Sequence, residues 1–151
     1  MRVVLYCLAL LLPALVHAQQ TQTYTGGAHN VTVGAHAALT LDLIRNGDGT
    51  YGLAITFDHV NLFGDVVATG GPPLTDDGYI ACAEGHECIT FEGTIALDSR
   101  SGFDDGTTTS FAMSLDLDGH SNTAMGVYHI GPLPGFTFEQ YGTITLATPV
   151  S

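Results

Sequence analysis

Two cysteines and a histidine stand close together in the segment Cys82-Ala-Glu-Gly-His86-Glu-Cys88, and these residue types are able to hold a metal ion. Thiolates and imidazole are zinc ligands, and this spacing is short enough to wrap one ion. In an oxidising compartment, however, the two sulfurs pair with each other and His86 is left as a turn residue. For an exported chain the sequence therefore predicts a disulfide between Cys82 and Cys88. Because the loop is short, chain entropy gives it a stabilisation of about 2 kcal/mol at best.

The first residues of the chain indicate export. Met1 to Ala18 contain a single charge, Arg2, then an apolar run and the small-residue exit Val16-His17-Ala18. This pattern is typical of a signal peptide, and the apolar core is short for a bilayer span. We expect residues 1–18 to be a signal peptide and residues 19–151 to form a single domain in the periplasm or outside the cell. The third cysteine, Cys7, lies in the expected signal.

The remaining candidate metal ligands are histidines and carboxylates. No two histidines are spaced at i,i+2 or i,i+4, so a copper or zinc site needs ligands from different strands. Carboxylates gather at residues 76–77, 104–105 and 116–118, and calcium prefers such oxygen ligands. Asp beside Gly is equally ordinary turn chemistry, and the last group departs from the EF-hand order. We therefore assign no metal ligand and keep divalent-metal binding as an alternative. The histidines of the expected mature chain are His29, His36, His59, His86, His120 and His129.

Motifs for catalysis are weak or missing. Gly119-His120-Ser121-Asn122-Thr123 differs by one residue from the nucleophile elbow Gly-x-Ser-x-Gly, but an elbow needs a strand-to-helix turn and a hairpin is expected here. No zinc-protease, phosphate-loop or dinucleotide motif occurs, and the absence of lysine excludes Schiff-base chemistry. We assign no catalytic residue and no cofactor, and we expect a protein without enzymatic activity.

The charge balance excludes two classes of partner. After the expected signal, the chain has two cationic side chains, Arg45 and Arg100, against fifteen carboxylates. Nucleic acids and anionic membranes are bound mainly through Lys and Arg, so neither is an expected partner. The partner is instead an unidentified protein or small molecule. The pattern Asn30-Val31-Thr32 is an acceptor for N-glycosylation, but the signal is similar to bacterial export signals, so we expect Asn30 to be unmodified.

Apolar residues in the mature part recur at every second position, which is typical of β-strands. Alternation over residues 37–43 and 51–57, with Asn46-Gly47-Asp48-Gly49 between them, predicts a hairpin, and residues 109–117 and 125–127 around the turn 118–122 predict another. Further strands are expected within residues 64–69 and over residues 89–97, where Gly93 marks a bend or the close approach of another strand. A last strand is expected from Phe136 to Leu146, with a bulge near Gly142. Residues 70–78 and 99–106 are predicted loops.

The sequence thus predicts an all-β fold, an antiparallel up-and-down meander of about seven or eight strands. A closed barrel is favoured over a sandwich, because consecutive hairpins close naturally and closure removes exposed edges. In this general arrangement, with a Gly-rich first hairpin, the chain resembles calycin and avidin-type barrels.

Three functions remain open. The first is an exported acidic domain that acts as a non-enzymatic binding or structural module, with its site on the loops at 70–78 and 99–106 if the barrel is filled. The second, which the resemblance implies, is a carrier of a small apolar ligand inside the barrel, where small residues would leave a cavity. The third is divalent-metal binding. The small residues are Gly52, Ala54, Gly93 and Gly126.

Overall fold

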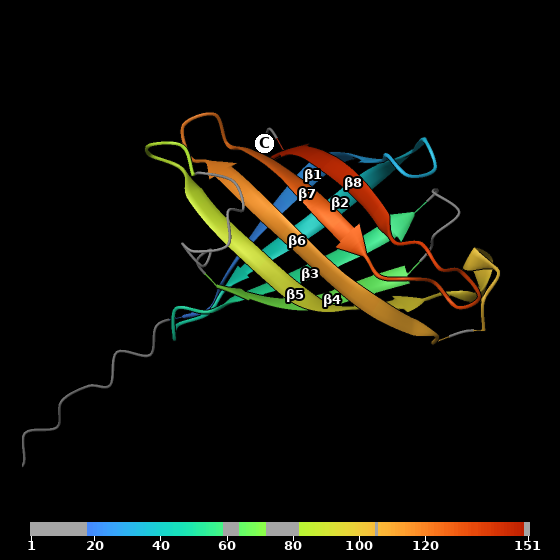
Figure 1. Ribbon diagram of the computed structural model, residues 1–151. Helices are drawn as coiled ribbons and strands as arrows, with labels where there is room; N and C mark the ends of the chain where they lie inside the picture. Colours follow the sequence, from blue (N-terminus) through green and yellow to red (C-terminus); the bar gives the residue numbers. More distant parts are fainter. Residues whose placement is uncertain (1–17, 59–63, 72–81, 105, 150–151) are drawn as a thin grey trace, which may run out of the picture.

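The fold is an eight-stranded antiparallel barrel in which every strand is hydrogen-bonded to its neighbours in sequence and β1 closes the ring with β8 (Figure 1). It was obtained as a computed structural model, which describes residues 18–58, 64–71, 82–104 and 106–149. A closed barrel was the favoured prediction, and it is confirmed. The strands are β1 (Gln20–Asn30), β2 (Ala35–Arg45), β3 (Tyr51–Asp58), β4 (Gly64–Gly71), β5 (Glu87–Leu97), β6 (Thr108–Asp118), β7 (Thr123–Ile130) and β8 (Gln140–Ala147).

The period-two alternation of the strands separates an apolar interior from a polar exterior. In β2, for example, Leu39, Leu41 and Leu43 are buried while Thr40 is exposed. The inward side chains of all eight strands form one cluster, and burial of each large aliphatic side chain stabilises the fold by about 1.5–3 kcal/mol. The largest buried members are Phe91, Leu41, Leu43, Ile89, Ile95, Leu97, Leu115, Ile130, Ile144 and Leu146.

The meander gives the barrel two distinct ends. One end, at the left of Figure 1, has the turns at residues 46–50 and 119–122 and the Cys82–Cys88 loop. The other end has the connections at residues 31–34, 98–107 and 131–139, the second of which contains the short 3-10 helix η1 (Ser99–Ser101). We call the latter the β7–β8 end. Within the described residues, no helix has the length and apolar character needed to cross a membrane.

The last strand is shorter than the sequence suggested. The prediction of a strand from Phe136 is wrong, because β8 begins at Gln140 and both Phe136 and Phe138 are exposed in the preceding connection. The Gly and Pro residues at 131–135 turn the chain across the β7–β8 end, and buried Leu133 packs against the core there. The predicted bulge near Gly142 is also wrong, since Gly142 pairs regularly with Tyr128.

Gly93 confirms the expected close approach of a neighbouring strand. A Cβ atom at this position would collide with the backbone of Val67 and Ala68 on β4. Gly126 is equally crowded, by the backbone of Ser114 and by Leu115 and Ile144, and Ala54 is exposed on the outside of the barrel. Gly93 and Gly126 therefore mark tight strand packing, and Ala54 lies on the outer surface.

The strand β1 was not located from the sequence. Tyr24 and Ala28 are buried on the inward side of β1, and Gly26 between them pairs with Leu39 and Leu146 but has no side chain, so the hydrophobic alternation of this strand is weak. Gly26 is required because a Cβ there would collide with the backbone of Thr145 and Leu146 on β8. The closure of the barrel thus depends on a glycine that carries no hydrophobic signal.

Candidate functional site

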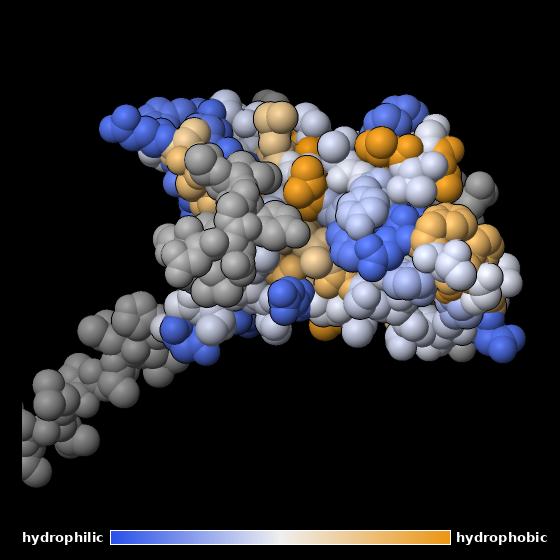
Figure 2. Space-filling view, in the orientation of Figure 1, coloured by the Kyte–Doolittle hydropathy of each residue, from blue (hydrophilic) through white to orange (hydrophobic). Residues whose placement is uncertain are grey.

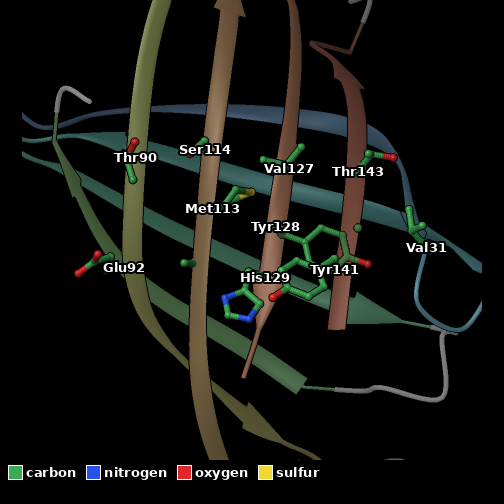
Figure 3. Close-up of a pocket in the computed structure, with 12 residues that line it drawn as sticks. Val31, Thr90, Glu92, Met113, Ser114, Val127, Tyr128, His129, Tyr141 and Thr143 are labelled. Carbon is green, nitrogen blue, oxygen red and sulfur yellow. The ribbon is translucent and has the colours of Figure 1, made fainter. Parts of the chain in front are cut away.

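A groove of about 470 Å³ crosses the outer surface of β5, β6, β7 and β8 (Figure 3). Its volume lies within the range of small-molecule sites. The floor of the groove is formed on β6 by the small side chains of Ala112 and Ser114. The longer side chains of Glu92 on β5 and His129 on β7 lie on either side of Ala112. The lining residues are Val31, Thr90, Glu92, Ala112, Met113, Ser114, Val127, Tyr128, His129, Tyr141, Gly142 and Thr143.

One wall of the groove is an aromatic pair held by a carboxylate. The rings of His129 and Tyr141, from β7 and β8, stack with centroids 4.6 Å apart and lie side by side in Figure 3. The hydroxyl of Tyr141 donates to Oε2 of Glu139 at 2.7 Å, and the same oxygen is 2.9 Å from Nε2 of His129, at ion-pair distance but without hydrogen-bond alignment. The bond from Tyr141 is the main cause that lowers the pKa of Glu139, so this carboxylate stays charged.

The groove combines apolar surface with negative charge. Tyr141, near the start of β8, is 53 % exposed, and Val127, in the middle of β7, is 40 % exposed. Glu92 stands on the opposite wall, from β5, and no Lys or Arg lines the groove. Hydrophobic side chains reach the polar outer surface over this face of the barrel in Figure 2. The groove therefore favours a ligand with an apolar body and a positive charge.

The arrangement lacks the parts of a hydrolytic site. Glu139 lies at ion-pair distance from Nε2 of His129, but within the described ranges this nitrogen has no hydrogen-bond partner, so no Ser, Thr or Cys hydroxyl or thiol is bonded to it. Ser121, from the near-elbow motif, lies in the β6–β7 hairpin turn and bonds with Asp118 and Thr123. This serine is a turn residue.

The cysteine loop is held by two contacts, one between its cysteines and one to the barrel. Cys82 and Cys88 lie at disulfide distance, with Cα atoms 5.8 Å apart, as the sequence predicts. Nδ1 of His86 is 2.6 Å from Oδ1 of Asp116 on β6, so the imidazole joins the loop to the barrel wall. A pair at this distance is compatible with an oxidising compartment.

The other candidate ligands do not assemble into a cluster of three. Residues 76–77, His59 and Asp105 lie outside the described residues, and in the part of the chain that is described no three His, Cys, Asp or Glu side chains could hold one ion. Asp118 stabilises the turn in which it lies, because it accepts hydrogen bonds from the backbone N–H of His120 and from the hydroxyl of Ser121. The bond from Ser121 is the main cause that lowers the pKa of Asp118.

The predicted loop at 70–78 was misplaced at its start, since Gly70 and Gly71 belong to β4.

A network of hydrogen-bonded polar side chains lies inside the barrel, at the end opposite the β7–β8 end. Arg45 donates to Glu87 at 2.7 Å and to Gln22 at 3.0 Å, and the hydroxyl of Tyr51 donates to the other oxygen of Glu87 at 2.6 Å. These residues occupy inward positions of β1, β2, β3 and β5. The network lies at this end of the core, and Arg45 uses it to pair with side chains of the protein itself.

Sequence reasoning missed the groove because its residues are far apart in the chain. The prediction that Met125 and Val127 form the apolar face of their strand is wrong, because β7 turns Ala124, Tyr128 and Ile130 inward and leaves Met125 and Val127 exposed. A scan against models of protein families found no match, and searches of the curated proteins and of the solved structures found none either.

Proposed function

We propose that this protein is an exported, non-enzymatic binding module, and that its site is the groove across the outer face of β5–β8. The observation that carries the proposal is a largely apolar, ligand-sized groove lined by the carboxylate of Glu92 and by no Lys or Arg, in a chain with a net charge of −12. We infer that the ligand is a small organic cation with an apolar body.

Each part of the groove has a role in this binding. The apolar body would cover Ala112 and Val127, and removal of apolar surface from water contributes about 25 cal/mol per Å². The cation would lie beside Glu92, which pairs with Ala112 in the strand register, and an exposed ion pair of this kind contributes about 0.2–1 kcal/mol. Negative charge over the whole surface would also draw cations to the molecule.

Export is part of the proposal and is supported by two features. The first is the signal-like segment 1–18, and the second is the Cys82–Cys88 pair at disulfide distance. Detection of a mature N-terminus at residue 19 in the extracytoplasmic fraction of the source cells would support export, and an intact first segment in the cytoplasm would contradict it.

The binding test compares three probes that share an apolar body and differ in charge. Phenylpropyl-trimethylammonium, phenylpropanol and phenylpropanesulfonate are titrated into ¹⁵N-labelled protein, and amide shifts are followed by NMR. We expect the cation to bind at least tenfold more tightly than the other two, with shifts centred on the outward residues of β5–β8. Equal binding of the sulfonate, or shifts centred elsewhere, would contradict the proposal. Shifts centred on buried residues would favour an interior carrier.

Matched variants separate the groove from general effects of charge and surface. Glu92→Gln should weaken the cation several-fold, whereas Glu84→Gln, in the exposed cysteine loop, should leave it unchanged. Ala112→Phe should fill the floor and abolish binding, whereas Ala54→Phe, on the outer face of β3, should have no effect. If the two members of either pair behave alike, the groove is not the site.

A further inference from the structure

The closure of the barrel brings two histidines together on the outer surface, next to the edge of the groove, because Thr143 of the groove lining pairs with His29. His29 on β1 and His36 on β2 are direct partners in the antiparallel register, and their rings stack with centroids 4.1 Å apart and planes within 6°. His36 is exposed and His29 is half-buried. Neither side chain takes part in the groove or in the network of Arg45.

A hollow of about 300 Å³ lies beside the two rings. Thr143 on β8 pairs with His29 on its other side, so Thr143, His29 and His36 form a row across three strands. Gly27, which has no side chain, and Thr145 leave space next to the row, and the two threonine hydroxyls are oxygen donors. The hollow is lined by Gly27, Ala28, His29, His36, Ala37, Thr143 and Thr145, without Lys or Arg.

We propose that His29 and His36 form a two-imidazole binding site for a late first-row divalent metal ion, with Cu²⁺ as the tightest ligand. Imidazole nitrogens suit Cu²⁺, Ni²⁺ and Zn²⁺, and affinities for one nitrogen site rise towards Cu²⁺ along the Irving–Williams order. The net charge of −12 favours the approach of a cation. Water and the hydroxyl of Thr143 are available for the remaining coordination positions.

The geometry requires a small rearrangement. Metal–nitrogen bonds of about 2.0–2.1 Å at a right angle place two donor nitrogens about 3 Å apart. This is closer than the 4.1 Å between the ring centres, and the stacked rings hold their nitrogen lone pairs in two nearly parallel planes. One imidazole must therefore turn out of the stack. The exposure of His36 and the hollow beside the pair allow this rotation without disturbing the core.

The test is a titration of the purified protein with Cu²⁺, followed by calorimetry and by electron paramagnetic resonance of the bound ion. We expect one Cu²⁺ per chain, with a signal split by two imidazole nitrogens. Ni²⁺ and Zn²⁺ should bind more weakly, and Ca²⁺ should not bind at this site. A protein that takes up no Cu²⁺, or whose bound Cu²⁺ shows no imidazole nitrogen, would overturn the proposal.

Variants assign the ion to this pair. His29→Gln and His36→Gln should each weaken Cu²⁺ binding at least tenfold, and the double variant should bind no Cu²⁺ at this site. His120→Gln removes an imidazole that is 93 % exposed in the β6–β7 turn, so binding should be unchanged in that variant. Circular dichroism shows whether each variant is folded. A folded double variant that retains full Cu²⁺ affinity would overturn the proposal, as would loss of binding in His120→Gln alone.

Discussion

Asn30 and Gln140 form a buried amide pair in which Nδ2 of Asn30 donates to Oε1 of Gln140 at 2.6 Å. The two residues are only 2 % and 7 % exposed, and they join the end of β1 to the start of β8. Oδ1 of Asn30 also accepts from the backbone N–H groups of Thr32 and Val33, at 3.1 and 3.3 Å. One polar side chain thus fixes both the 31–34 turn and the closure of the barrel.

Replacement of Asn30 by Ala should lower the free energy of unfolding by about 1–3 kcal/mol, because it leaves buried polar groups without partners. Urea denaturation measures the loss. Asn46→Ala is the control, since Asn46 bonds with Thr50 in an exposed turn, and its loss should be smaller. An equal loss of unfolding free energy in the two variants would show that the buried amide pair stabilises the fold no more than a hydrogen bond in an exposed turn does.

The same burial predicts that Asn30 carries no glycan in the folded protein. The nitrogen that would carry the sugar is the one that donates to Gln140. Expression in a secreting eukaryotic cell, followed by peptide mass analysis, should therefore find folded protein with unmodified Asn30. Folded protein with full occupancy of this position would contradict the prediction.

Gly93→Ala should destabilise the barrel by about 1–3 kcal/mol, because the added Cβ meets the backbone of β4 and the strands must move apart. Gly71→Ala is a matched control at the end of β4, where a Cβ meets nothing within 4 Å. This control should be neutral or slightly stabilising, since Gly in a strand costs conformational entropy. Thermal unfolding of the two variants should give shifts of opposite sign or of clearly different size.

The cysteine pair should be oxidised in protein recovered from its native compartment. Intact mass before and after alkylation checks this, and two alkylated thiols without prior reduction would contradict it. Reduction, or replacement of both cysteines by Ser, should cost about 2 kcal/mol, because the closed loop is short. Since His86 separately joins the loop to Asp116, the barrel should remain folded after reduction.

Glu87 should make stability depend on acid. Burial raises its pKa, but the hydrogen bonds from Arg45 and Tyr51 outweigh that effect, so the pKa lies below the ordinary value of 4.5. A carboxyl group with a lowered pKa stabilises the fold above its unfolded pKa, and this stabilisation is lost as the pH falls through the folded pKa. The loss should therefore begin near pH 5 and continue below pH 4.5.

Glu87→Gln checks this assignment. The side chains of Glu87 and Arg45 are 39 % and 30 % exposed, and solvent screening limits such a pair to about 1 kcal/mol. The variant should lose roughly that amount at pH 7 and should show a shallower decrease of melting temperature between pH 5 and pH 3. An unchanged pH profile would show that other carboxyl groups control the acid response.

Local patterns in the sequence determined the fold class. The alternation in residues 37–43 and 109–117, and the turn residues between the paired strands, act over a few positions, and the structure has those hairpins. Cys82 and Cys88 are six residues apart, so their approach also follows from a local turn.

The tertiary structure decided what lies on the surface. His29 faces His36, and His129 faces Tyr141, only because the register of each strand pair is fixed over the whole ring. Phe138 was expected inside a strand, but the connection at 131–139 turns across the end of the barrel and leaves it exposed. Period two correctly indicates the buried side of β2 and β6, but it fails on β7, where Met125 and Val127 are exposed. It does not give the register or the neighbours, since these depend on the packing of residues that are distant in the chain.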